Sequence, residues 1–242
     1  MPVPDARLLV DVLPEAGGPV RVTGDEVSHA QARRLSPGDP VILVDGSGRE
    51  AVGRLTRVAR NGLDVEIDSV RLAPPDPLPP LILCVAAVRA ERLAWIAEKA
   101  TELGAARLTL VSTERTQRFR ASEALVPRLS RVVREAAKQS ERARWPAITG
   151  PVPLSELLVA EGSGNRLILD SSGEAFPPEL PSELTVLLVG PEGGWSDAEL
   201  QAALSAGWIA VSLAAGKLRA ETAAVAALTL ARHALHAGIV NR

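Results

Sequence analysis

The residues best suited to chemistry lie at positions 190–196, which read Gly190-Pro191-Glu192-Gly193-Gly194-Trp195-Ser196. Three glycines let the backbone take positive φ angles and approach a ligand with no Cβ in the way. The run lacks the lysine and spacing of a phosphate loop, and it is not a G-x-G-x-x-G fingerprint. Ser196 and Glu199 predict the capping box of a following helix. The motif therefore predicts a ligand-binding turn between a strand and a helix, with a plain tight turn as the alternative.

A second candidate lies at Leu218-Arg219-Ala220-Glu221-Thr222-Ala223, after a glycine-containing loop at 214–217. Arg219 and Glu221 flank a predicted helix start, where a carboxylate suits the positive end of the helix dipole. The pattern indicates either a functional loop or an ordinary salt bridge at a helix N-terminus.

The middle of the chain is basic, although the net charge of the whole chain is only −2. Residues 89–144 carry a net charge of +6, whereas residues 1–88 carry −3 and residues 145–242 carry −5. Arginine predominates among the basic residues, and its planar fork suits phosphate. The distribution predicts a local surface that binds a polyanion, while an arginine-rich coding bias is the alternative for the residue type.

A third motif, EAAKQSER at 135–142, extends a predicted helix within this basic segment. Arg128, Arg131 and Lys138 come close to one face of that helix. A solvated face with i,i+4 pairs explains such a helix equally well.

The other reactive side chains give no indication of a functional site. His233 and His236 have no further ligand beside them, so no metal site is expected. Cys84 lies in an apolar run and is expected to be an inert core residue. Ser171-Ser172 lacks the context of a nucleophile elbow, which argues against a serine hydrolase.

Two regions of different pattern must position these motifs. Residues 1–72 are predicted to form a small, mostly β domain, and the proline-rich segment at 73–80 (APPDPLPP) a semi-rigid linker. Turn signals separate three short strands, and one helix precedes them. The predicted helix is Asp25–Leu35, and the predicted strands are Val41–Asp45, Gly53–Val58 and Leu63–Val70.

Residues 81–242 alternate strands with helices, which predicts a parallel sheet covered on both faces. Apolar strand-like runs fall at Leu81–Val88, Arg107–Val111, Leu167–Asp170, Leu184–Val189 and Ile209–Leu213. Helical patterns fall at Leu93–Leu103, Glu123–Arg142, Asp197–Ala206 and Glu221–His236.

The composition points to the cytosol. A single cysteine suits a reducing compartment. No signal peptide is visible at the N-terminus. No uncharged apolar stretch reaches the roughly 18 residues of a membrane span. We therefore expect a soluble cytoplasmic protein.

Four motifs carry a resemblance to a known family: GPEGGWS, LRAETA, EAAKQSER and, upstream, EKATELG at 98–104. The chain closely resembles the RsmE family. These are 16S ribosomal RNA uridine-N3 methyltransferases of the SPOUT superfamily. The resemblance runs over essentially the whole chain. It implies a PUA-like β domain at the N-terminus and an α/β domain with a C-terminal trefoil knot. It also implies S-adenosylmethionine as cofactor, a homodimer, and 16S RNA of the small ribosomal subunit as partner.

The family's functional residues carry over by position. Gly190, Pro191, Glu192 and Gly193 would form one wall of the cofactor site. Leu213, Leu218 and Arg219 would line the last knot loop, and Leu169 the loop after an earlier strand. Residues expected to hold RNA phosphates, without reading sequence, are Arg7, Arg89, Arg115, Arg118, Arg120, Arg128, Arg131 and Arg142.

The chain departs from the family pattern at several positions. Ala214-Ala215 replaces a usual glycine-bearing segment, and Ala220 replaces a usual threonine. Trp195 stands where phenylalanine is usual, and Arg89 where a lysine commonly begins the first helix. The aromatic exchange is expected to preserve packing.

Methyl transfer to uracil N3 requires loss of the N3 proton or stabilisation of the charge that spreads onto the carbonyl oxygens. Arg219 is the predicted catalytic residue for the second task. The proton acceptor stays open between Glu135, Glu192 and Glu221.

Three alternative functions remain. The first is a related SPOUT enzyme acting on transfer RNA or another ribosomal site. The second is a Rossmann-type methyltransferase with a small-molecule substrate, although its glycine-rich turn would normally come early in the chain. The third is a non-catalytic RNA-binding or ribosome-assembly protein.

Overall fold

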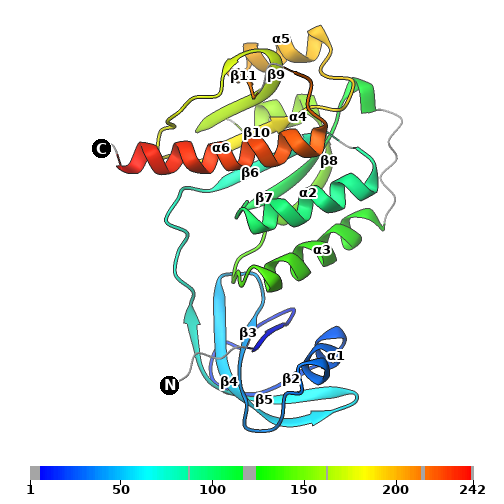
Figure 1. The fold of residues 1–242 in the computed structure, drawn as a ribbon, viewed down its shortest axis with the longest axis vertical. Coiled ribbons are helices and arrows are strands. Elements are labelled where there is room, and N and C mark those ends of the chain that lie inside the picture. The colour runs from blue at the N-terminus through cyan, green and yellow to red at the C-terminus, as the bar shows by residue number, and fades with distance from the viewer. Residues whose placement is uncertain (1–5, 87, 117–123, 162, 214–215, 241–242) are drawn as a thin grey trace. The chain divides into compact units, whose positions relative to one another are not determined.

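A computed structural model describes residues 6–86, 88–116, 124–161, 163–213 and 216–240 of the chain (Figure 1). The chain divides into two compact units. The first comprises Met1–Pro75 and Ala137–Arg144, and the second comprises Asp76–Ala136 and Trp145–Arg242. The division at Pro75 falls inside the predicted linker at 73–80. The short segment 137–144 was expected in the second domain but belongs to the first unit.

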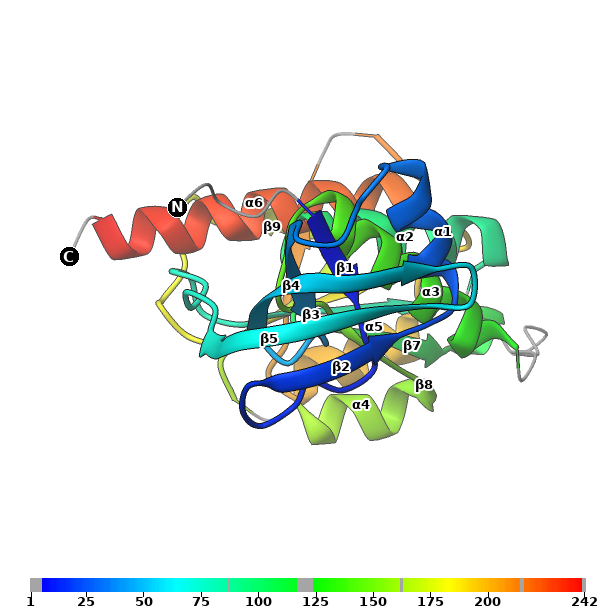
Figure 2. The same ribbon diagram turned by 90° about the horizontal axis from the view of Figure 1, so that it is seen from below.

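The first unit is built on a five-stranded sheet in the order β1-β3-β4-β5-β2 (Figure 2). Neighbouring strands are antiparallel except β1 and β3, which are parallel. The elements are β1 (Ala6–Leu9), β2 (Gly18–Val22), α1 (Asp25–Ala32), β3 (Pro40–Val44), β4 (Arg49–Ala59) and β5 (Gly62–Leu72). The three predicted strands and the helix are confirmed, with shifted ends. The edge strands β1 and β2 were missed, and β2 begins with Gly18-Pro19, a pair that signals a turn more than a strand.

One lysine of the basic segment belongs to the interior of the first unit. Lys138 Nζ lies 2.7 Å from Glu26 Oε2, and each side chain is only 7% exposed. Lys138 therefore does not belong to a solvated face of the helix, the alternative explanation of the EAAKQSER motif. Its partner lies 112 residues earlier in the chain, a distance at which no helical spacing gives a signal.

The turn after β3 is organised by the carboxylate of Asp45. Its Oδ1 accepts hydrogen bonds from the backbone N–H and the hydroxyl of Ser47, at 3.0 and 2.5 Å. Its Oδ2 accepts from Leu13 N at 3.2 Å and from Arg49 Nη2 at 3.2 Å. Burial alone raises the pKa of Asp45, but the hydrogen bonds from Ser47, Leu13 and Arg49 together lower it below 3.8.

Replacing Asp45 by asparagine is expected to destabilise the first unit by about 1–2 kcal/mol at neutral pH, because an amide group then faces two donors. A lowered folded-state pKa contributes stability above the unfolded pKa, and this contribution is lost as pH falls through the folded value. The difference between the two proteins should therefore shrink below pH 3.8. Hydrogen exchange of the β3 and β4 amides measures this difference in stability. Equal exchange at pH 7 would contradict the assignment.

The second unit is built on a six-stranded sheet in the order β11-β9-β10-β6-β7-β8, with all neighbours parallel. Its strands are β6 (Leu81–Ala86), β7 (Arg107–Ser112), β8 (Ala147–Pro153), β9 (Asn165–Ala175), β10 (Thr185–Val189) and β11 (Ile209–Ser212). Its helices are α2 (Ala90–Glu102), η1 (Glu114–Thr116), α4 (Leu154–Ala160), α5 (Asp197–Ser205) and α6 (Ala220–Val240), and α3 (Leu125–Gln139) lies mostly within it. The predicted doubly covered parallel sheet is confirmed.

Strand β6 shows why both faces of the sheet are covered. Its alternate residues enter two different cores, with Leu83 in one and Cys84 in the other, and both are fully buried. The first core also contains residues of α2, α3 and α6, and the second contains residues of α4 and α5. Burial raises the pKa of the Cys84 thiol to about 12, so this thiol is unreactive, as predicted.

The sequence missed β8 and α4. Strand β8 reads AITGPVP, and its glycine and two prolines signal a turn more than a strand. It is nevertheless an edge strand, where a proline need not donate to a neighbour. Helix α4 has only seven residues, which is too short for a clear helical period.

Helix α6 was not expected to span a membrane, yet its 21 residues are long and apolar enough to do so by length and composition. Many of its small and apolar side chains, among them Ala224, Leu228 and Leu235, pack into the core against the sheet. The helix therefore has the character of a core helix of this unit.

Strands β9 and β11 approach each other in an irregular way. Ala210 pairs with Ile168, but the next residue, Val211, pairs with Glu174. A Cβ on Gly173 would lie 2.5 Å from the carbonyl carbon of Ala210, so only glycine permits this approach. The trefoil knot that the family resemblance implies stays a prediction.

Candidate active site

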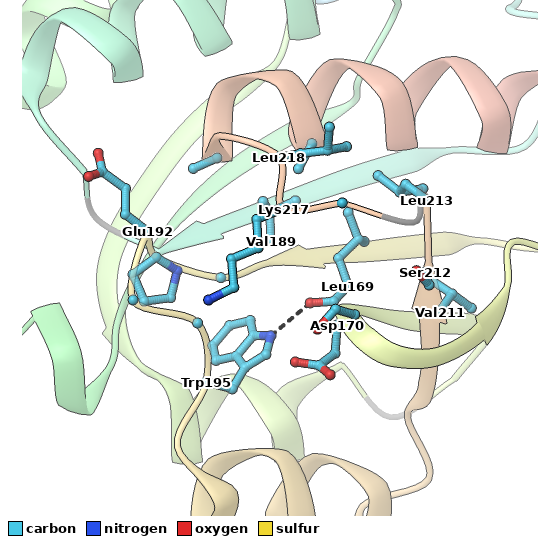
Figure 3. A pocket seen from close by; sticks show the side chains of 18 of the residues that line it. Leu169, Asp170, Val189, Glu192, Trp195, Val211, Ser212, Leu213, Lys217 and Leu218 are labelled. Carbon is cyan, nitrogen blue, oxygen red and sulfur yellow. Dashed lines mark hydrogen bonds between the residues drawn. The ribbon is translucent and has the colours of Figure 1, made fainter.

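One cavity of about 300 Å³ opens at the carboxyl ends of β10 and β11 and beside the middle of β9 (Figure 3). Residues 169–171 of β9 form one side, so Leu169 lies within its strand and not in a loop after it, and the turn Gly190–Trp195 after β10 forms another side. Val211–Leu213 at the end of β11 and Gly216–Leu218 before α6 complete the wall. The carboxyl edge of a parallel sheet is where such folds bind ligands.

The side chains around the turn after β10 leave little room for a Cβ atom at two of its glycines. A Cβ on Gly190 would lie 2.9 Å from the indole ring of Trp195, and one on Gly193 would lie 3.1 Å from Cδ of Arg115. Gly194 takes a φ of +74°, in the left-handed region that favours glycine. The turn therefore presents backbone N–H and C=O groups to the cavity with no side chain in front of them.

The predicted capping box at the end of this turn is confirmed. Glu199 N donates to Ser196 Oγ at 3.3 Å, and Ser196 N donates to Glu199 Oε2 at 2.9 Å. The other oxygen of Glu199 accepts from Glu114 N at 2.7 Å. The cap thus links the start of α5 to the segment that follows β7.

Trp195 ties two walls of the cavity together. Its Nε1 donates a 2.9 Å hydrogen bond to the carbonyl oxygen of Leu169, and the side chain is buried (Figure 3). Phenylalanine, usual at this position in the resembling family, has the same apolar character but no donor. The indole N–H therefore adds a link between β9 and the turn after β10.

Replacing Trp195 by phenylalanine is expected to lower the free energy of unfolding by about 1–2 kcal/mol, because the Leu169 carbonyl loses its donor. Urea denaturation measures this change. Phenylalanine should be better tolerated than leucine, since it keeps an aromatic ring against Gly190. A Trp195→Phe protein as stable as the wild type would contradict a role for the hydrogen bond.

Arg92 of α2 joins two of the sequence motifs, and the sequence did not single it out. Its Nη1 forms an ion pair with a carboxylate oxygen of Glu192 in the glycine-rich turn. Its Nε lies 3.7 Å from Oε1 of Glu221 at the start of α6. The side chain of Glu221 is 16% exposed, and its Oε2 has no hydrogen-bond partner among the residues that the structure describes. Arg92 therefore neutralises two carboxylates, one from the glycine-rich turn and one from the first turn of α6.

Arg115 was predicted to bind RNA, but the structure places it on the cavity wall. Its Nη1 donates to the carbonyl oxygen of Gly193. In this position the guanidinium supports the glycine-rich turn.

Seven of the eight predicted cofactor residues line the cavity: Leu169, Gly190, Pro191, Glu192, Gly193, Leu213 and Leu218. The eighth, Arg219, is exposed and does not line it. The departures at Ala214-Ala215 lie outside the described residues.

The remaining predicted RNA contacts are scattered. Arg89, Arg128 and Arg131 are exposed, and Arg142 is half-buried. Arg118 and Arg120 lie outside the described residues. Arg7 is only 20% exposed, and its Nη2 lies 2.9 Å from the buried carboxylate of Glu50, which also binds Arg71.

The candidate proton acceptors separate into two groups. Glu192 and Glu221 lie beside Arg92, whereas Glu135 is exposed on α3. Among the residues the structure describes, no group of three or more metal-binding side chains gathers.

Comparison with known proteins gives a consistent result for both units. The RNA methyltransferase domain profile matches residues 74–232, and an RNA methyltransferase PUA domain profile matches residues 22–68. The ribosomal RNA small subunit methyltransferase E of Mycobacterium tuberculosis is 34% identical, over 90% of this chain and 88% of its own length.

Two solved structures resemble the whole chain. A ribosomal RNA small subunit methyltransferase E from Neisseria gonorrhoeae, bound to S-adenosyl methionine, has a TM-score of 0.81 and 27% identity, and the match covers 93% of this chain and 95% of that one. A Legionella pneumophila protein described as a methyltransferase, in complex with the cofactor SAM, has a TM-score of 0.82 and 26% identity, with coverages of 94% and 97%. The chain therefore belongs to the RNA methyltransferase family of the ribosomal RNA small subunit methyltransferase E type.

Proposed function

We propose that this chain is an S-adenosylmethionine-dependent methyltransferase that methylates N3 of a uridine in 16S ribosomal RNA of the small subunit. The observation that carries the proposal is the convergence of three separate segments on one cavity. Leu169, the turn at 190–193, and Leu213 with Leu218 were named from the sequence alone, and all of them line it. The names of the relatives support the class of substrate.

The residues present fit this cofactor. A cavity of about 300 Å³ lies at the lower end of the usual range for small-molecule sites. Leu169, Val189 and Leu213 supply an apolar wall for an adenosine group, and the backbone of Gly190–Gly193 supplies polar groups without intervening Cβ atoms. Leu218 closes the last loop of the site.

S-adenosylmethionine, when bound, supplies a methyl group that its sulfonium has already activated. The residues of this chain then have to align the acceptor and manage its charge. In the proposal, the guanidinium of Arg219 stabilises the negative charge on the uracil carbonyl oxygens as N3 loses its proton. Glu135, Glu192 and Glu221 remain the candidate acceptors for that proton.

The proposed RNA surface consists of arginines that hold phosphates. Arg89, Arg128 and Arg131 are exposed and available for this task. Arg7 already pairs with Glu50, which makes it the weakest member of the predicted set. With only 2% aromatic residues, the chain offers little for stacking of single-stranded bases. Recognition of an assembled ribosomal particle by its shape suits this surface better.

We further propose a homodimer that acts in the cytoplasm without a metal.

Comparison of ribosomal RNA from a deletion strain with RNA from its parent tests the function. We expect N3-methyluridine to disappear from 16S RNA in the deletion strain and to return on complementation. Loss of a methyl group from transfer RNA or from another ribosomal site would move the assignment to a different substrate. A cofactor titration with no heat of binding would instead favour a non-catalytic RNA-binding protein.

A further inference from the structure

The charged side chains of the cavity differ in how they are already engaged. In the described part of the chain, four of them line the wall: Arg115, Asp170, Glu192 and Lys217. Arg115 donates to the Gly193 carbonyl, and Glu192 pairs with an arginine of α2. Asp170 Oδ1 accepts from the backbone N–H and the hydroxyl of Ser172, at 2.8 and 2.6 Å.

Lys217 is the exception. It forms no hydrogen bond or ion pair with the residues that the structure describes. Figure 3 shows its side chain extending from the loop before α6 across the cavity, toward the side where Trp195 lies. Leu169, Val211 and Leu213 lie on the other side of the cavity, where Asp170 and Ser212 are also labelled. Three apolar side chains thus gather away from the uncommitted ammonium group of Lys217.

We infer that Lys217 forms a subsite for the carboxylate of the amino-acid part of the cofactor, an inference that rests on the proposed function. The bound molecule has an apolar adenosine at one end and an amino-acid group at the other. The apolar side of the cavity suits the first, and the ammonium suits a carboxylate through a charge-assisted hydrogen bond.

An RNA phosphate is the other anion that an ammonium group could bind. The wall argues against it, because its two acidic side chains, Asp170 and Glu192, balance Arg115 and Lys217, and a site for a polyanion would carry a surplus of positive charge. A zwitterionic amino-acid group carries both signs of charge and suits a wall of mixed charge.

Ligands with and without the amino-acid group test the inference. We would titrate S-adenosylhomocysteine and 5′-methylthioadenosine, which lacks that group, into the wild type and Lys217→Met by calorimetry. The Kd for S-adenosylhomocysteine should rise about 10-fold in the variant, as for loss of one charge-assisted hydrogen bond. The Kd for methylthioadenosine should change by less than about 2-fold.

Two further variants complete the experiment. Lys217→Arg keeps the charge and should recover most of the affinity. Lys99→Met removes a lysine paired with Glu98 and Glu102 on α2, and it should bind both ligands like the wild type.

The outcomes separate this inference from the proposed function. Equal weakening for both ligands would mean that Lys217 only shapes the cavity, and unchanged affinity with a higher KM for ribosomal subunits would assign it to RNA phosphate. Either result overturns the carboxylate subsite. Failure of the wild type to bind S-adenosylhomocysteine would contradict the proposed function itself.

Discussion

Replacing Arg219 by alanine is expected to lower kcat for methyl transfer at least about 100-fold, the usual cost of removing a group that stabilises developing negative charge. The Kd for S-adenosylmethionine should change by less than about 3-fold, because Arg219 is exposed and does not line the cavity. Single-turnover methylation of small ribosomal subunits measures the first quantity, and calorimetry measures the second.

A conservative variant sharpens the Arg219 experiment. Arg219→Lys keeps a positive charge but loses the planar fork, so it should retain part of the activity. If cofactor binding collapses together with activity in Arg219→Ala, the residue belongs to the cofactor site and has no separate catalytic role.

Replacing Arg92 by alanine is expected to raise the Kd for S-adenosylmethionine about 5- to 30-fold. The change leaves the carboxylates of Glu192 and Glu221 without their shared cation, and the Glu221 side chain is only 16% exposed. Loss of one partner from a partly buried ion pair costs about 1–2 kcal/mol once solvent screening is allowed for. Glu192 lines the cavity, and Glu221 lies in the first turn of α6 beside Ala220, which also lines it, so repulsion between the two carboxylates should open the cavity.

A double-mutant cycle tests this account of Arg92. Glu221→Gln in the Arg92→Ala background should recover much of the affinity, since the uncompensated charge is then absent. Arg131→Ala, an exposed arginine of α3, serves as the matched control and should bind the cofactor normally. Strictly additive effects of the Arg92 and Glu221 substitutions would contradict the shared ion pair.

Local sequence patterns predicted the parts of the fold that depend on near neighbours. The alternation of β6 between two cores and the capping box at Ser196 were both readable from a few consecutive residues. Strand β8 was not readable, because its glycine and prolines are tolerated only by its place at the sheet edge.

Long-range pairs limited what the sequence predicted about the site. Two motifs, GPEGGWS and LRAETA, supply nine of the nineteen described residues of the cavity wall, since each is contiguous in the chain, whereas EAAKQSER supplies none. Arg92 was missed because its two partners, Glu192 and Glu221, lie far along the chain, and Arg7 was grouped with RNA contacts because Glu50 lies 43 residues away. Arginines of this chain therefore serve a buried carboxylate, a cavity wall or the solvent-exposed surface, and the residue type alone does not distinguish these roles.

The proposed reaction is methylation of uridine N3 in 16S ribosomal RNA. Its most direct test incubates the purified protein with S-adenosylmethionine carrying a labelled methyl group and small ribosomal subunits from the deletion strain, followed by nucleoside analysis of the 16S RNA. The account predicts one labelled nucleoside, N3-methyluridine, at about one per subunit for a single modified site, and none with Arg219→Ala. Label in a different nucleoside, or no label in 16S RNA under conditions in which the protein binds S-adenosylmethionine, would contradict it.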